Sequence, residues 1–199
     1  ARNLLGIVYD QTGRAADAEK EYREAIRLKP NAVSRRANLG ILLARSTRRL
    51  EALTVMQSVL KLDPRHPQTL INIGRVHSAL GEYREAIAFL EKAIVLQPDN
   101  PDIMLNFGIA LFHNKRSDDS KIVLEKLAMM RPGAQVFYYL GLIDTANLQN
   151  QNASVNFRRS LTFDPTFSDA HFMLGELAAK ENRLAEALGN TEENVHKWL

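Results

Sequence analysis

Three asparagines recur at a fixed interval and are the side chains best suited to bind another molecule. Asn38, Asn72 and Asn106 each stand two residues before a glycine, in the triplets NLG, NIG and NFG, and lie 34 residues apart. A side-chain amide offers both a donor and an acceptor, so it can pair with the backbone of an extended peptide without reading its side chains. The regular interval predicts a ladder of three equivalent amides.

Catalytic and metal-binding chemistry has little support in the sequence. The five histidines are not paired at metal-ligand spacing, and there is no cysteine to supply a thiolate. No glycine-rich phosphate loop, nucleophile elbow or HExxH motif occurs. We therefore predict a chain without a catalytic site, metal or cofactor, so that any catalytic domain would lie outside these 199 residues.

Composition and charge are typical of a folded chain with mixed charges. Apolar residues make up 45% of the sequence and charged residues 25%. Basic residues exceed acidic ones by three, and their interspersion argues against nucleic acid as the partner. No apolar run approaches the roughly 18 residues that a membrane span needs. A place in a membrane-associated assembly, the compartment and the oligomeric state stay open.

The elements that must position the asparagines form a repeat. Within each interval apolar residues recur twice at helical spacing, with a short polar turn between them, which predicts two helices closed by a proline. A fixed period in this range is typical of a solenoid. The glycines and prolines that recur in step are Gly6, Gly40, Gly74, Gly108, Gly141 and Gly175, and Pro30, Pro64, Pro98, Pro132 and Pro165.

These small residues and closing prolines resemble the tetratricopeptide repeat family over essentially the whole chain. The resemblance implies an all-α, right-handed superhelical solenoid of antiparallel helix pairs, with the first helices lining a concave groove. It implies one array over residues 1–199. Because the first unit begins partway into its first helix and no polar capping helix follows Leu199, we expect the chain to be part of a longer protein. The expected units are 1–32, 33–66, 67–100, 101–133, 134–167 and 168–199.

Several residues depart from the family pattern. Ser120 and Leu127 replace the usual alanines of the fourth unit, and Thr47 and Lys115 replace a turn glycine. Asp144 stands where a large apolar residue is usual. These departures predict altered local packing around the fourth and fifth units.

The last segment, Arg183 to Leu199, has two interpretations. It resembles a DNA-binding helix-turn-helix, with a turn at Gly189 and a second helix after it. Glu192 and Glu193 at the DNA-facing start of that helix argue against this interpretation. A divergent last repeat is the favoured alternative.

The groove is predicted to change from amide-lined to aromatic along its length. The ladder is similar to the asparagine ladder of the O-linked N-acetylglucosamine transferase repeats, and an aromatic stretch suits an apolar side chain or an amphipathic partner helix. The alternative is that the amides are solvated bystanders and the aromatic rings are core packing. The candidate aromatic contacts are Phe112, Tyr138, Tyr139 and Phe172.

A cluster of arginines around the second unit is a candidate patch for an acidic partner. The family's clamp for a terminal carboxylate is not supported, because Arg75 is the only basic candidate beside an asparagine. A solvated face is the alternative interpretation of the cluster. Its members are Arg35, Arg36, Arg45, Arg48 and Arg49.

The sequence thus predicts a non-enzymatic scaffold that binds a protein or peptide segment in its groove. Two alternatives stay open: a substrate-recruiting arm of a larger enzyme, such as a glycosyltransferase, and a structural subunit of a large assembly. Fold alone does not decide among them.

Overall fold

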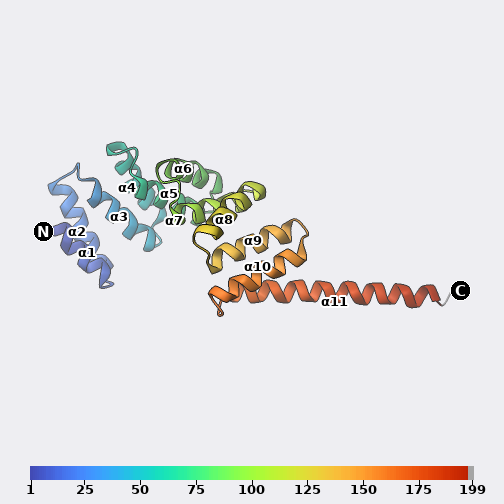
Figure 1. Cartoon of the computed structure of the whole chain (residues 1–199). Helices are drawn as coiled ribbons and strands as arrows, with labels where there is room; N and C mark the ends of the chain where they lie inside the picture. The colour runs from blue at the N-terminus through green and yellow to red at the C-terminus, as the bar shows by residue number, and fades with distance from the viewer. Residues whose placement is uncertain (197–199) are drawn as a thin grey trace. The chain divides into compact units, whose positions relative to one another are not determined.

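The computed structural model describes the backbone of residues 1–196 and the side chains of residues 1–182, and the described backbone forms eleven helices (Figure 1). The chain divides into two compact units, Ala1–Lys115 and Arg116–Leu199. The all-α fold predicted from the helical periodicity is confirmed.

The first unit is a series of antiparallel helix pairs. The closest packing joins α1 to α2, α3 to α4 and α5 to α6, and α6 also packs on α7. The first helices of the pairs contact one another in the order α1, α3, α5, α7, so they form a continuous row. The helices are α1 (Arg2–Gln11), α2 (Ala15–Leu28), α3 (Val33–Arg45), α4 (Arg49–Leu62), α5 (Pro67–Ala79), α6 (Tyr83–Leu96) and α7 (Pro101–His113).

Two of the first helices, α5 and α7, begin at local capping signals. At the start of α7, the Asn100 side-chain oxygen accepts a hydrogen bond from the backbone N–H of Asp102 at 3.0 Å. Pro101 at the first helical position loses no hydrogen bond there, because that N–H has no partner inside the helix. Helix α5 begins in the same way with His66 and Pro67.

The turns within the helix pairs each hold one residue in the left-handed conformation. Glycine takes this place at Gly13 and Gly81, whereas Thr47, Lys115 and Leu148 adopt it with φ of 62°, 64° and 60°. For a residue with a Cβ atom this conformation costs roughly 1–2 kcal/mol. Thr47 and Lys115, which replace the usual turn glycine, therefore adopt the same left-handed backbone conformation as Gly13 and Gly81, but with backbone strain.

Four glycines let the two helices of a pair approach closely. A Cβ atom added at any of them would lie 2.6–2.7 Å from a side-chain carbon of the second helix. Such distances are far below van der Waals contact, so these places accept only glycine unless the facing side chain moves. The pairs are Gly6 with Tyr22, Gly40 with Met56, Gly74 with Leu90 and Gly141 with Phe157.

The second unit contains α8 (Ser117–Met130), α9 (Ala134–Ala146), α10 (Asn150–Phe163) and α11 (Ser168–His196). Helices α9 and α10 form its closest pair, α8 packs on α9, and α11 packs on α10. Phe157 of α10 and Leu177 of α11 meet in its core, where both are fully buried.

Helix α11 differs from the two-helix sixth unit expected over residues 168–199. It runs for 29 residues and continues through Gly189, where the helix-turn-helix interpretation of the segment from Arg183 to Leu199 placed a turn. A single glycine disfavours a helix by only about 1 kcal/mol, and the alanine, leucine and glutamate residues before it are strong helix formers. The turn of the disfavoured helix-turn-helix interpretation is therefore absent from the described backbone.

Asp144 forms a buried polar contact that joins three helices of the second unit. Its side chain on α9 is 3% exposed and accepts hydrogen bonds from Lys121 Nζ of α8 at 2.8 Å and from Asn156 Nδ2 of α10 at 2.7 Å. Both carboxylate oxygens thus have a partner, which a buried charge requires. A polar network replaces the large apolar residue that the repeat pattern leads one to expect here.

The Lys121–Asp144 pair predicts a dependence of stability on pH. The hydrogen bond to Asp144 raises the pKa of the Lys121 ammonium above its ordinary value of 10.5. Because the folded-state pKa is the higher one, the pair's stabilisation is complete below that ordinary value and is lost as the pH rises through the raised pKa. We expect urea unfolding to show a constant stability difference between wild type and Lys121→Met up to pH about 10, and a shrinking one above it. A difference that is equally large at the highest pH would contradict the assignment.

Candidate partner-binding groove

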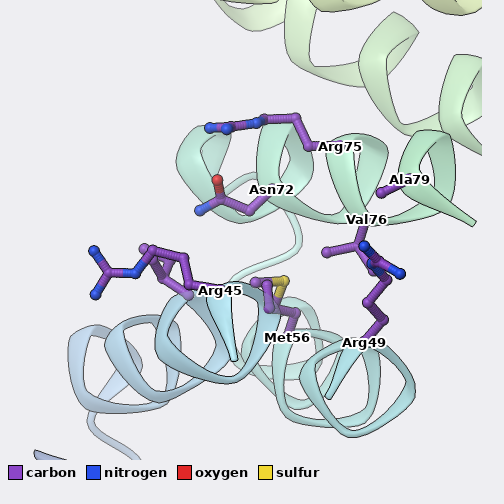
Figure 2. A pocket seen from close by; sticks show the side chains of 9 residues that line it. Arg45, Arg49, Met56, Asn72, Arg75, Val76 and Ala79 are labelled. Carbon is purple, nitrogen blue, oxygen red and sulfur yellow. The ribbon is translucent and has the colours of Figure 1, made fainter. Parts of the chain in front are cut away.

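A groove with a volume of about 230 Å³ lies between α3, α4 and α5 in the first unit (Figure 2). We call it the α3–α5 groove. Its floor is apolar and its rim is polar and basic, so an apolar side chain with polar neighbours would match it. The floor residues are Ile41, Ala44, Met56, Val76 and Ala79, and the rim residues are Arg45, Arg49, Asn72 and Arg75.

Asn72 is the amide of the predicted ladder that lines this groove. It is half-buried, and its Oδ1 atom accepts a long hydrogen bond of 3.4 Å from Gln68 Nε2 on the same helix. Its Nδ2 group donates no hydrogen bond to any described residue. Asn72 can therefore offer an N–H donor to a bound peptide carbonyl.

The other two amides of the ladder are engaged differently. Asn106 Nδ2 donates to the backbone carbonyl of Asp102 at 2.6 Å, one turn earlier on its own helix. Asn38 Nδ2 approaches Asn3 Oδ1 at 3.5 Å, which connects α3 with α1. The three places are equivalent in the sequence, but their side chains make different contacts.

The rim of the α3–α5 groove carries net positive charge. Arg45 forms an ion pair with Asp10 of α1, whereas the guanidinium groups of Arg49 and Arg75 have no hydrogen bond or ion pair with any described residue. None of the residues that line the groove is acidic. A planar guanidinium matches the geometry of a carboxylate, so this rim suits an acidic group.

The remaining arginines of the predicted patch make contacts within the first unit. Arg35 donates to the Ala25 carbonyl at 2.7 Å, and Arg36 donates to the Pro30 carbonyl at 2.9 Å. Both contacts hold the start of α3 against the end of α2. These two guanidinium groups therefore have a structural role in the described first unit.

Arg48 belongs to an ion-pair network that joins α2 to the start of α4. It contacts Glu19 at 2.7 Å and also pairs with Glu51, and Arg23 pairs with the same two carboxylates. Arg23 and Arg48 lower the pKa of the Glu51 carboxyl through their hydrogen bonds. The contact with Glu19 has no signal in the sequence, because Glu19 and Arg48 are brought together only when α2 and α4 pack in the folded unit.

The aromatic residues proposed for the groove are divided between the two units. Phe112 lies in the last turn of α7 in the first unit and is half-buried. Its ring packs edge-on against the His113 ring, with centroids 5.3 Å apart. Tyr138, Tyr139 and Phe172 belong to the second unit, so no common surface is assigned to the four.

Tyr138 is largely a packing residue. Its ring lies edge-on to the Phe167 ring, with centroids 5.2 Å apart, and its centroid is 5.9 Å from that of the Phe157 ring. Burial, with a smaller effect of the Asp169 charge, raises the pKa of the Tyr138 phenol. Tyr139 is half-buried beside it, at 5.4 Å. Phe172 is 67% exposed on α11, which makes it the aromatic candidate most open to solvent.

The sequence analysis did not indicate that Arg75 and the apolar floor residues belong to one site. Aligned on the repeat glycines, the place after the glycine holds Ile7, Ile41 and Ile109 in the first, second and fourth units and Arg75 in the third. A single charge among these four places was the signal that could have marked Arg75. The contribution of Met56 had no comparable signal, because it depends on how α4 packs under α3 and α5.

Tetratricopeptide repeat models match the chain over residues 1–32, 43–94 and 79–141. The chain belongs to the tetratricopeptide repeat family. The family resemblance inferred from the glycines and prolines is thereby confirmed. No curated protein sequence matches the chain.

Solved structures of other tetratricopeptide repeat proteins have the same fold. The 41-end fragment of MamA from Desulfovibrio magneticus RS-1 is 20% identical with a TM-score of 0.78, covering 83% of this chain and 94% of its own. TTC0263, a thermophilic protein of Thermus thermophilus, is 14% identical with a TM-score of 0.67, covering 89% and 97%. YrrB, a tetratricopeptide repeat protein with an unusual peptide-binding site, is 22% identical with a TM-score of 0.68, covering 81% and 84%. These similarities show a shared fold.

Two further properties concern the described part of the tetratricopeptide chain. None of its helices is both long enough and apolar enough to cross a bilayer. Over the same residues, no group of three or more histidine or carboxylate side chains is arranged to hold a metal ion.

Proposed function

We propose that this tetratricopeptide repeat chain is a non-enzymatic interaction scaffold that binds a segment of a partner protein in the α3–α5 groove. The observation that carries the proposal is an apolar floor beside Asn72, whose amino group is free to donate. Membership of the family supports it, and so does the peptide-binding site of the structurally similar YrrB. We further propose that both units belong to one array and that Phe172 is a separate apolar contact site on the second unit.

Two contacts would contribute most of the affinity at this groove. Burial of one large apolar side chain against Ile41, Ala44 and Ala79 would contribute roughly 1.5–3 kcal/mol. A hydrogen bond from Asn72 Nδ2 to a peptide carbonyl would contribute about 1 kcal/mol. The helices already hold the floor in place, so little conformational entropy is lost by the receptor on binding.

The first test is a selection of displayed random peptides against the full chain, followed by calorimetric titration of the enriched peptides. We expect Asn72→Ala to weaken their binding about five- to tenfold through loss of the amide hydrogen bond. Asn106→Ala is the matched control, because that amide already donates to the backbone of its own helix. We expect this control to bind as wild type does.

The position of the peptide is measured separately, by nuclear magnetic resonance of labelled methyl groups. Shifts of the Met56 and Val76 methyl signals on peptide addition would support the α3–α5 groove. If no peptide is enriched, or if the shifts lie in the second unit while Met56 is unaffected, the proposal is wrong.

A further inference from the structure

We infer that the α3–α5 groove selects an internal acidic segment of its partner, in which aspartate or glutamate residues flank one apolar side chain. The inference rests on the proposed function and specifies the class of partner. It concerns carboxylates within a chain, not a terminal carboxylate, a phosphate or a nucleic acid.

The charges at the rim are the first argument. Arg49 and Arg75 have no ionic partner among the described residues, and no acidic residue lines the groove. Arg45 contacts Asp10 through one nitrogen, Nη2, and a guanidinium has five N–H donors, so Arg45 retains donors for a second carboxylate. Nothing in the described groove offsets the charges of Arg49 and Arg75, so an acidic segment would complement them.

The placement of these groups is the second argument. In Figure 2 the guanidinium groups of Arg45 and Arg49 lie on opposite sides of Met56, and that of Arg75 lies beyond Asn72. The three guanidinium groups therefore do not point toward one common anion position in this structure. Separate carboxylates on either side of an apolar residue can each meet one arginine, and the planar guanidinium suits a bidentate carboxylate contact. The spread therefore favours an acidic peptide over a single phosphate group.

The apolar floor is the third argument, because it requires more than charge from the partner. The accessible apolar surface of the groove comes from Ile41 and Ala44, which are half-buried, and from Ala79, which is exposed. Met56 and Val76 line it from below and are 1% and 5% exposed. A purely acidic segment would leave this surface in contact with water. An apolar residue between the acidic ones would cover it and so add burial to the electrostatic attraction.

The test uses the full chain and random peptides displayed with blocked C-termini, so that no terminal carboxylate contributes. We expect wild type to enrich peptides with acidic residues on both sides of a leucine, isoleucine, methionine or phenylalanine. The Arg49→Glu/Arg75→Glu double variant should lose these peptides. Arg84→Glu, which changes an exposed arginine of α6 outside the groove, should retain them.

Titration of one enriched peptide gives the size of the effect. We expect at least about tenfold weaker binding to the double variant, and a similar loss when the peptide's acidic residues are replaced by glutamine or asparagine. Raising the salt concentration should weaken the wild-type complex, since exposed charge pairs are screened. The Arg49→Gln/Arg75→Gln variant serves the same purpose if charge reversal prevents folding, which circular dichroism would detect.

The outcomes separate this inference from the proposed function. If neutral or basic peptides shift the Met56 methyl signal and bind both double variants as wild type does, the acidic class is wrong and the scaffold function stands. If no peptide binds the groove, both are wrong. Tighter binding of a phosphoserine version of the peptide, or of single-stranded DNA, would also overturn the acidic-segment inference.

Discussion

Lys121→Met is expected to lower the free energy of unfolding by about 3 kcal/mol. The reason is the position of Asp144, whose side chain is 3% exposed while that of Lys121 is 31% exposed. Removing the ammonium leaves a buried carboxylate with a hydrogen bond from Asn156 but without its opposite charge. Burial of a charge without its ionic partner is far more unfavourable than loss of an exposed ion pair, which contributes about 0–1 kcal/mol.

The measurement is urea unfolding of the full chain, followed by far-ultraviolet circular dichroism at neutral pH. Lys180→Met is the control, because Lys180 lies exposed on α11, and its effect should stay within about 0.5 kcal/mol. The Lys121→Met/Asp144→Leu double variant should recover much of the loss, since it removes the carboxylate together with its partner. Equal losses in Lys121→Met and Lys180→Met would show that the pair contributes no more than an exposed charge.

Gly141→Ala is expected to destabilise the chain by about 1–2 kcal/mol, although alanine is the better helix former. An added Cβ atom would lie 2.6, 2.7 and 2.9 Å from three carbons of the Phe157 ring. That ring is fully buried in the core of the second unit, so it cannot move aside without disturbing α10. The overlap should outweigh the roughly 1 kcal/mol that alanine contributes through helix propensity.

Gly175→Ala is the matched control for this prediction and should have the opposite sign. A Cβ atom at Gly175 in α11 meets no atom of the described residues within 4 Å, so only helix propensity changes. We expect a stabilisation of up to about 1 kcal/mol, measured by urea unfolding of both variants side by side. If Gly141→Ala also stabilises the chain, then α9 and α10 are less closely packed than the structure shows.

The sequence by itself determined the repeat, the helix pairs and the family. Glycines and prolines in step at intervals of 33 or 34 residues, with helical apolar spacing between them, are local patterns. Each pattern acts through backbone sterics or the burial of one helix face, so it can be interpreted without knowing distant contacts. The same interval correctly indicated equivalent places for Asn38, Asn72 and Asn106 on successive first helices.

Only the tertiary structure decided which of these side chains are available to a partner. Asn72 and Asn106 occupy equivalent places, yet Asn106 donates to the Asp102 carbonyl while the amino group of Asn72 has no acceptor among the described residues. Within the arginine cluster, Arg48 pairs with Glu19 from another helix, whereas Arg49 lines the α3–α5 groove. The physical reason is that a side chain's free donors depend on neighbours brought together by helix packing, and residue type and spacing do not specify those neighbours.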